Sequence, residues 1–188
     1  MISTVFKLWL TLSSLLLTLT VFLVKNSLLL NDLSSYVSHA QLSSIIKNLP
    51  NWGSYLFYFL VVVLCTWLST LLIKFLSDEQ ISRGRIASIE TANDAFLPSY
   101  LGYFFVALSI SDIATFTYVF SLIFIFIFFS KISFFNPVFL LFGYKFFNLT
   151  NTDGLKILVM TKQELKVPCD VEFTSLKRIN NYTFISKE

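Results

Sequence analysis

Apolar residues along this chain of 188 residues gather in long runs that short polar intervals separate. A helix of about 20 apolar residues crosses a bilayer, because it rises about 1.5 Å per residue and the hydrocarbon core is roughly 30 Å thick. We interpret four nearly uncharged runs as spans, at about residues 5–24, 55–76, 96–110 and 115–135. The pattern therefore predicts a four-span transmembrane domain at residues 1–137.

The third and fourth runs belong to one stretch, from Phe96 to Phe135, that carries hardly a charge. As a single helix it would be about 60 Å long, twice what a bilayer needs. Hydroxyl residues around Asp112 break the stretch, so we predict a tight helical hairpin that Pro137 follows. Asp112 is predicted to face water or to cap the next helix, and an ion- or proton-handling role for it stays open.

Two polar intervals also carry helical patterns. Apolar residues recur at helical spacing over about residues 31–49, which predicts an amphipathic helix on the outer side of the membrane or a connecting helix folded against the bundle. The stretch "SDEQISRGRIASIETANDAF" begins with good cap residues and places Glu79 and Arg83 four apart. It predicts a solvated helical connector, or alternatively a surface that docks a partner through Arg83 and Arg85.

After Pro137 the period of the pattern changes. Apolar and polar residues partly alternate in "FGYKFFNLT", Asp153-Gly154 is a strong hairpin turn signal, and the aliphatic "LKILVMT" follows. Two further strand-like segments are "DVEFTSLKRI" and "YTFIS". Because open sheet edges do not persist in lipid, we predict that residues 138–188 form a small antiparallel β-domain in water.

Composition supports a membrane protein. Hydrophobic residues make up 55% of the chain, charged residues only 13%, and the mean hydropathy is +0.73. A soluble domain typically carries about 25% charged residues, so this chain has too much apolar surface for one water-surrounded core. The predicted fold class is an α-helical membrane bundle of four transmembrane helices with a small C-terminal cytoplasmic all-β domain.

The distribution of Lys and Arg sets the predicted orientation. Seven of these residues lie in the tail from Lys145 onward, whereas the turn between Ser109 and Thr117 has none. Because basic residues favour the cytoplasmic side, we place the tail, the N-terminus and the connector with Arg83 and Arg85 in the cytoplasm.

The chain shows few signs of chemistry. It has no nucleophile–base arrangement, phosphate-binding glycine loop or paired-carboxylate motif, so we expect no enzyme activity, no catalytic residues and no cofactor. The single His39 has no Cys or His neighbour, and the two cysteines are far apart, so no metal site is expected. A channel or carrier is an alternative, although the spans lack central charges and internal repeats.

The basic tail indicates a protein partner rather than DNA. From Lys145 to Glu188 seven basic residues face five acidic ones, which is too near balance for strong nonspecific binding of nucleic acid. The partner-binding candidates are Lys177, Arg178 and Asn180, because Arg178 could make bidentate contacts to a carboxylate. The alternative is that Arg178 pairs within the sheet or meets anionic lipid headgroups.

Three segments carry a family resemblance: "FNPVFLLFGYKF", "NLTNTDGLKILVMTKQELKVP" and the ending "LKRINNYTFI". Together with the spacing of the apolar runs they resemble the KwaA family, the membrane subunits of the Kiwa bacterial antiphage defence system. The resemblance implies an inner-membrane protein that senses phage attack at the envelope and recruits a cytoplasmic, DNA-binding, KwaB-like effector. It also implies a homo-oligomer, with a tetramer suspected. The residues alone leave open a membrane immunity protein against a toxin, or a small transporter.

Overall fold

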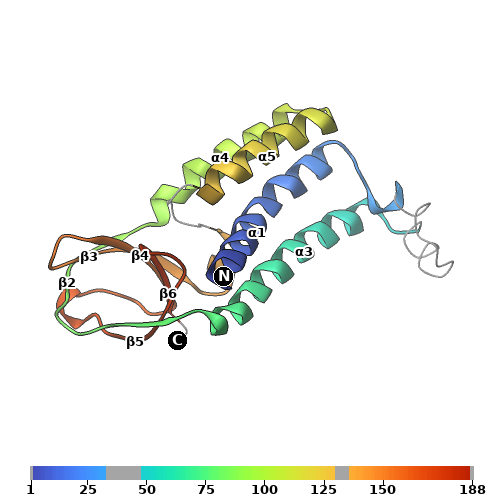
Figure 1. Ribbon diagram of the computed structural model, residues 1–188. Coiled ribbons are helices and arrows are strands. Elements are labelled where there is room, and N and C mark those ends of the chain that lie inside the picture. The colour runs from blue at the N-terminus through green and yellow to red at the C-terminus, as the bar shows by residue number, and fades with distance from the viewer. Residues whose placement is uncertain (1, 33–47, 130–135, 187–188) are drawn as a thin grey trace.

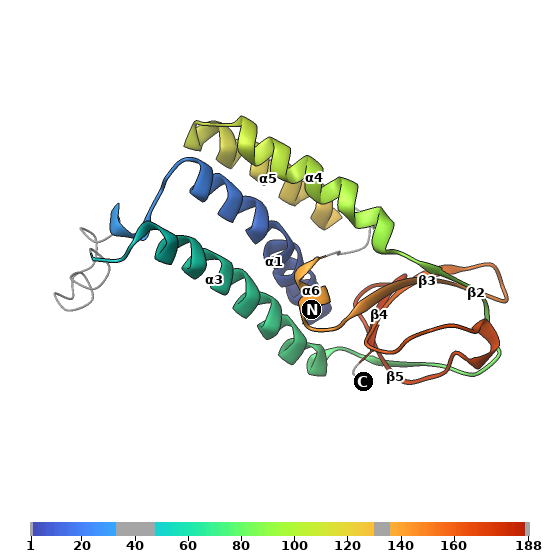
Figure 2. The same cartoon turned by 180° about the vertical axis from the view of Figure 1, so that it is seen from behind.

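The computed structural model describes residues 2–32, 48–129 and 136–186. Its long helices lie together at one end of the molecule and a curved β-sheet lies at the other (Figure 1). Both ends of the chain lie where the helices meet the sheet, as the reverse view also shows (Figure 2). The long helices are α1 (Ile2–Lys25), α3 (Asn51–Leu72), α4 (Asn93–Ser109) and α5 (Ile113–Phe129).

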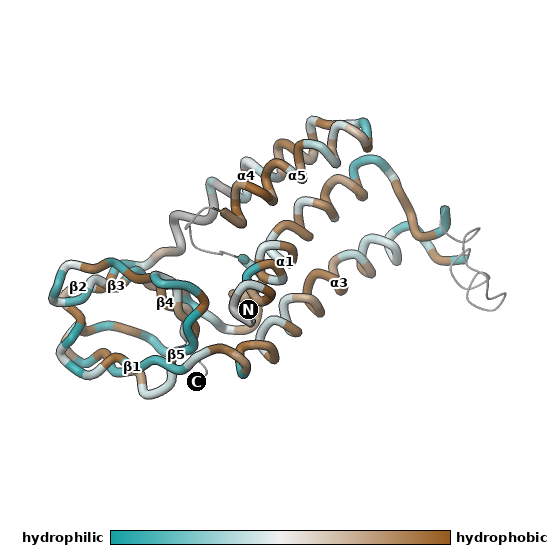
Figure 3. The backbone as a smooth tube through the Cα atoms, viewed as in Figure 1, coloured by the Kyte–Doolittle hydropathy of each residue, from teal (hydrophilic) through white to brown (hydrophobic). Residues whose placement is uncertain are grey.

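Helix α1 is the central helix, because it contacts α3 on one side and both α4 and α5 on the other. Polar groups on the facing sides link these helices. The indole Nε1 of Trp9 donates to the carbonyl oxygen of Cys65 at 3.3 Å and to Ser69 Oγ at 3.1 Å. The hydroxyl of Tyr100 on α4 donates to the carbonyl oxygen of Ser14 at 3.1 Å. The helices are mostly apolar along their length, whereas polar residues alternate with apolar ones along the sheet (Figure 3).

The predicted four-span helical bundle is wrong. Among the described residues, two helices are long and apolar enough to cross a membrane, at Thr4–Lys25 and Asn51–Phe75; the second includes the 3-10 turn Ile73–Phe75 that continues α3. Helices α4 and α5 have 17 residues each, which is about 25 Å of helix and short of the roughly 30 Å of a hydrocarbon core. The structure combines two long apolar helices, a shorter apolar helical hairpin and a mixed sheet.

The turn of that hairpin behaves as the sequence predicts. The backbone amide and the hydroxyl of Thr115 both donate to Asp112 Oδ2, at 2.7 and 2.9 Å. Asp112 therefore caps the start of α5, and these hydrogen bonds lower the pKa of its exposed carboxyl. The predicted amphipathic helix at 31–49 cannot be compared, because residues 33–47 lie outside the described part of the chain.

Six strands form one mixed sheet in the described residues, in the order β1-β5-β6-β4-β3-β2. Strands β4 and β6 run parallel, and every other neighbouring pair is antiparallel. The strands are β1 (Asp78–Ile81), β2 (Ile86–Thr91), β3 (Lys145–Asn151), β4 (Lys156–Thr161), β5 (Phe173–Arg178) and β6 (Thr183–Ser186).

The four strands predicted after Pro137 are confirmed as β3 to β6, with β3 and β4 joined by the turn at Asp153-Gly154. The interpretation of the preceding connector as a helix is wrong, because residues 78–91 supply β1 and β2. The sheet is also not purely antiparallel. The local cap and charge signals of the connector are outweighed by pairing with strands that lie far away in the sequence, which a local pattern does not reveal.

The sheet must be strongly curved. In a flat sheet of six strands, the two outer strands would lie five spacings of about 4.8 Å apart, or roughly 24 Å. Strands β1 and β2 are these outer strands, yet only residues 82–85 separate them in the chain. Five extended steps, from Ile81 to Ile86, cover at most about 18 Å. The sheet therefore curls, and its two outer strands approach each other.

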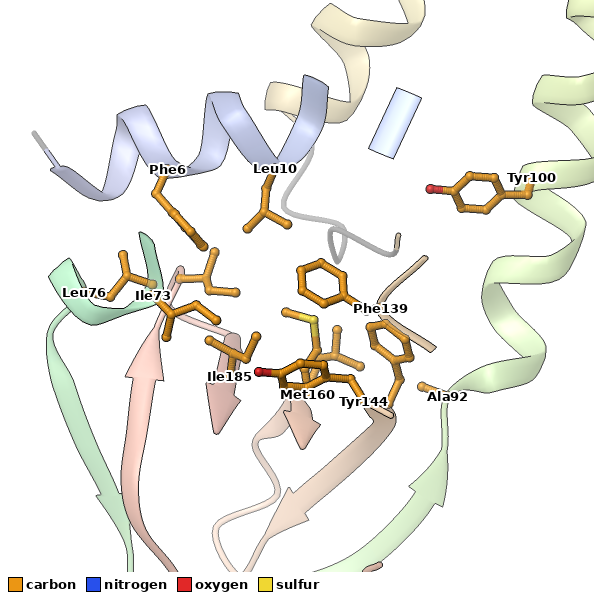
Figure 4. Packing of buried hydrophobic residues seen from close by; sticks show 13 residues of the cluster. Phe6, Leu10, Ile73, Leu76, Ala92, Tyr100, Phe139, Tyr144, Met160 and Ile185 are labelled. Atoms are coloured by element: carbon orange, nitrogen blue, oxygen red, sulfur yellow. The ribbon is translucent and has the colours of Figure 1, made fainter. Parts of the chain in front are cut away.

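The two faces of the sheet bury different clusters, because successive residues of a strand point to opposite sides. Ile157 and Val159 of β4 belong to a cluster inside the curl, here called the sheet core. Leu158 and Met160 belong instead to a cluster at the base of the helices, here called the helix–sheet junction. From the helices and the segments next to them, the junction includes Phe6, Leu10, Ile73, Leu76, Tyr100 and Phe139 (Figure 4).

Candidate functional site

A cleft of about 390 Å³ opens from the sheet core beside β1. Its walls come from the end of β1, the start of β2, the turn between β3 and β4, and the β5–β6 pair. The cleft therefore draws together segments that lie about 100 residues apart in the sequence. Because the cleft combines an apolar floor with charged groups at its rim, we treat it as the candidate site.

The cleft runs along the edge of a strand. Four consecutive residues, 79–82, all line it. Side chains of a regular strand alternate between its two faces, so a run of consecutive residues along one cleft is what a cleft that follows the edge and the end of a strand would show. Strand β1 stands at the end of the sheet order and pairs with β5 alone among the described strands. Its unpaired edge therefore adjoins the cleft.

The floor of the cleft is apolar. Ile86, Ile157 and Leu176 are buried members of the sheet core, and Phe184 beside them is half-buried. At the rim, Leu155 in the turn between β3 and β4 is 46% exposed. An exposed leucine next to an opening into an apolar core is a surface that a hydrophobic side chain of a partner would cover.

The charges at the rim are unequally compensated. Glu79 Oε1 lies 3.2 Å from Arg178 Nη1, so these two charges neutralise each other. The exposed side chain of Arg85, which also lines the cleft, makes no hydrogen bond or ion pair with any residue that the structure describes. The cleft therefore presents one unneutralised positive charge.

Lys177, a sequence candidate for partner contact, is buried instead. Its side chain is only 8% exposed, and its Nζ donates to the carbonyl oxygen of Leu76 at 3.0 Å and to Asp78 Oδ2 at 2.8 Å. These bonds tie β5 to the segment that leaves α3. The structure thus gives Lys177 a role in joining the helices to the sheet, away from the cleft.

Arg178 and Asn180 lie near the cleft but are held by the sheet itself. Besides Glu79, Arg178 contacts Asn181 Oδ1 through Nη2 at 2.8 Å. Asn180 Oδ1 accepts from the amide of Tyr182 at 2.7 Å and so shapes the turn before β6. Glu79 and Asn181, the two residues that bind Arg178, both line the cleft. Arg178 therefore holds two residues of the cleft wall in place.

Arg83 and Arg85 lie in the turn between β1 and β2 and differ in their surroundings. Arg83 forms an ion pair with Asp170 in the 3-10 turn Pro168–Asp170, and both side chains are more than half exposed. That pair links the turn to the loop before β5, whereas Arg85 alone faces the cleft. Of the five sequence candidates, Arg85 is thus the one with a free charge at the site.

Sequence reasoning missed the apolar part of this site. Leu155 and Phe184 were not singled out, although Leu155 directly follows the predicted Asp153-Gly154 turn and is an unusual residue to leave exposed there. No local signal marks Phe184 as a cleft residue. Among the described residues, no three His, Cys, Asp or Glu side chains gather in an arrangement that would hold a metal ion.

Comparisons with known proteins complete the description. Residues 6–185 match the family model described as anti-phage protein KwaA, so the match covers nearly the whole chain. No curated protein and no solved structure matches the chain.

Proposed function

The chain belongs to the KwaA family of anti-phage proteins, and from that premise we propose that it is a membrane-anchored sensor that recruits a cytoplasmic effector during phage attack. In this proposal the long helices α1 and α3 hold the protein in the bacterial inner membrane. The sheet lies in the cytoplasm and binds the effector. The protein performs no chemical reaction and needs no cofactor.

The observation that carries the proposal is the helix–sheet junction. Phe6 and Leu10 of α1 pack in the same buried cluster as Leu158, Met160 and Ile185 of the sheet. A tightly packed apolar cluster transmits displacement, because its side chains cannot shift independently. A disturbance of the membrane helices would therefore reach the sheet directly.

Charge and geometry together support the proposed orientation. Helix α1 begins at the sheet and α3 returns to it, so two spans leave both ends of the chain on the sheet's side (Figures 1 and 2). Most of the Lys and Arg residues of the chain lie on that side. The positive-inside tendency then supports a cytoplasmic sheet and cytoplasmic termini.

Lipid and further copies of the chain are the partners proposed for the helices. The outer face of α3 exposes large apolar side chains, among them Trp67 at 47% and Phe57 at 48%. Such a face suits acyl chains or the helices of other copies, and we propose that the protein forms a homo-oligomer, a tetramer, in the membrane. Mass measurement of the intact assembly in nanodiscs tests this part.

The recruitment test uses cell fractionation. The chain is co-expressed with a KwaB-like effector that carries a fluorescent tag, and the effector is followed in the membrane and soluble fractions. We expect the effector to sediment with membranes only when the chain is present. A reporter fused after residue 186 should at the same time give a cytoplasmic signal.

The fractionation tests recruitment and the reporter tests orientation, so each part of the proposal can fail separately. An effector that stays soluble although the chain is in the membrane contradicts recruitment. A reporter signal from outside the cytoplasm contradicts the orientation, and with it any direct contact between the sheet and a cytoplasmic effector.

A further inference from the structure

The open edge of β1 offers backbone hydrogen bonds that nothing in the described sheet uses. The carbonyl oxygen of Ser77 accepts from the amide of Arg178 on β5. In an antiparallel pair, the backbone groups of successive residues point alternately toward the neighbour and away from it. The backbone of Gln80, at the irregularity between Glu79 and Ile81, is therefore directed away from β5 and toward the cleft.

The cleft beside this edge suits one extended chain. Added strands lie about 4.8 Å from the edge that they join, and their side chains alternate between the two faces. A chain placed along β1 would direct one set of side chains at the apolar floor around Ile86 and Phe184, next to the exposed Leu155. The other set would face the rim.

The charge at the rim selects the chemistry of that chain. Arg85 carries the unneutralised charge, whereas Glu79 is already paired with Arg178. A carboxylate is the group that a guanidinium binds with two parallel hydrogen bonds. A single free cation does not suit a nucleic-acid backbone, since that contact needs several phosphates to be neutralised together.

We infer that the free edge of β1 and the adjoining cleft bind an extended, acidic segment of the protein partner by strand addition, with an apolar side chain in the cleft and a carboxylate on Arg85. This inference rests on the proposed function, because the segment belongs to the recruited effector. It adds the mode of recognition and the chemical character of the segment.

Amide hydrogen exchange on the full-length chain in nanodiscs tests the inference, with a purified KwaB-like effector as the probe. Strand addition forms new backbone hydrogen bonds on the side of β1 that faces away from β5, so the amide of Gln80 should exchange more slowly when the effector is bound. The amides of β4, which already has a strand on each side, should show no such change. A contact made by side chains alone would leave the exchange rate of the Gln80 amide unchanged.

Two variants and a control complete the test. Arg85→Glu reverses the free charge and should weaken effector binding by roughly tenfold or more. Gln80→Pro removes an amide from an edge position where proline is tolerated, and should weaken binding while the sheet stays folded. Lys166→Glu makes the same charge change at a residue outside the cleft whose side chain is 80% exposed, and should bind normally.

The results distinguish this inference from the proposed function. If the effector binds the wild-type chain but both variants bind equally well and β1 gains no protection, strand addition at the cleft is wrong and recruitment stands. If the wild-type chain binds no effector, the proposed function fails and the inference falls with it. If amide exchange in β1 slows as the concentration of the chain rises in the absence of effector, the edge binds a second copy of the chain and the inference is wrong.

Discussion

Lys177 and Arg178 are adjacent in the sequence, but the sequence does not show that their side chains have different surroundings. Their adjacency near a turn predicts a basic surface, yet neighbours on a strand point to opposite faces. Lys177 is buried against the carbonyl oxygen of Leu76, while Arg178 meets Glu79. Both acidic partners, Asp78 and Glu79, lie about 100 residues earlier in the chain, so only the fold reveals that the two cations are already paired.

Replacing Lys177 by methionine should destabilise the attachment of β5 to the helices. The substitution keeps the length of the side chain but leaves the carbonyl oxygen of Leu76 without its donor, which costs about 2 kcal/mol for a buried acceptor. We expect a lower melting temperature of the purified protein by near-ultraviolet circular dichroism. Lys166→Met, at an exposed residue, should leave the melting temperature unchanged. Equal melting temperatures for the two variants would show that the buried contact of Lys177 is unimportant.

At the scale of the elements, the hairpin of β3 and β4 could be predicted because its signal is local. Asn151 Oδ1 accepts from the amides of Asp153 and Leu155, at 3.0 and 2.8 Å, and Gly154 takes a positive φ of 81°. Turn residues with such preferences are visible in any sequence. Strands β1 and β2 lack an equally strong local signal. They form by pairing with β5 and β3, which lie far away in the sequence.

Two glycine substitutions should separate backbone strain from loss of space. An added methyl group meets nothing within 4 Å at Gly154 or at Gly102, but only Gly154 has a positive φ. Gly154→Ala should therefore lower the free energy of unfolding by about 1–2 kcal/mol. Gly102→Ala, inside helix α4, should leave it unchanged or raise it slightly, because alanine has the higher helix propensity. Denaturant titration of both variants measures the difference, and a stable Gly154→Ala hairpin would contradict the account of the turn.

At the scale of the whole molecule, the apolar runs and the β-rich tail could be predicted, but their arrangement could not. Hydropathy marks residues 96–135 as strongly as it marks the first two runs, yet the break at Asp112 leaves helices of 17 residues. The strong curvature of the sheet follows from pairing residues 78–91 with the tail. Such long-range pairing carries no periodic signature in either segment, so the cleft between them was also beyond sequence reasoning.

The last prediction tests whether the helix–sheet junction couples the two halves of the molecule. Leu158 and Leu149 are both buried leucines of the same sheet, but Leu158 packs in the junction and Leu149 in the sheet core. Truncation of either to alanine should lower the free energy of unfolding by about 2–5 kcal/mol, because each leaves a cavity.

The two variants should differ in where the structure loosens. Leu158→Ala removes contacts to the helix ends, so amide exchange should accelerate around Leu10 and Ile73, and protection of cells against phage should fall. Leu149→Ala should accelerate exchange within the sheet and leave the helix ends protected. If both variants loosen the helix ends equally, the junction is not a separate mechanical link. The sheet would then respond as one unit with the helices, and a signal could not be assigned to the contacts of Leu158.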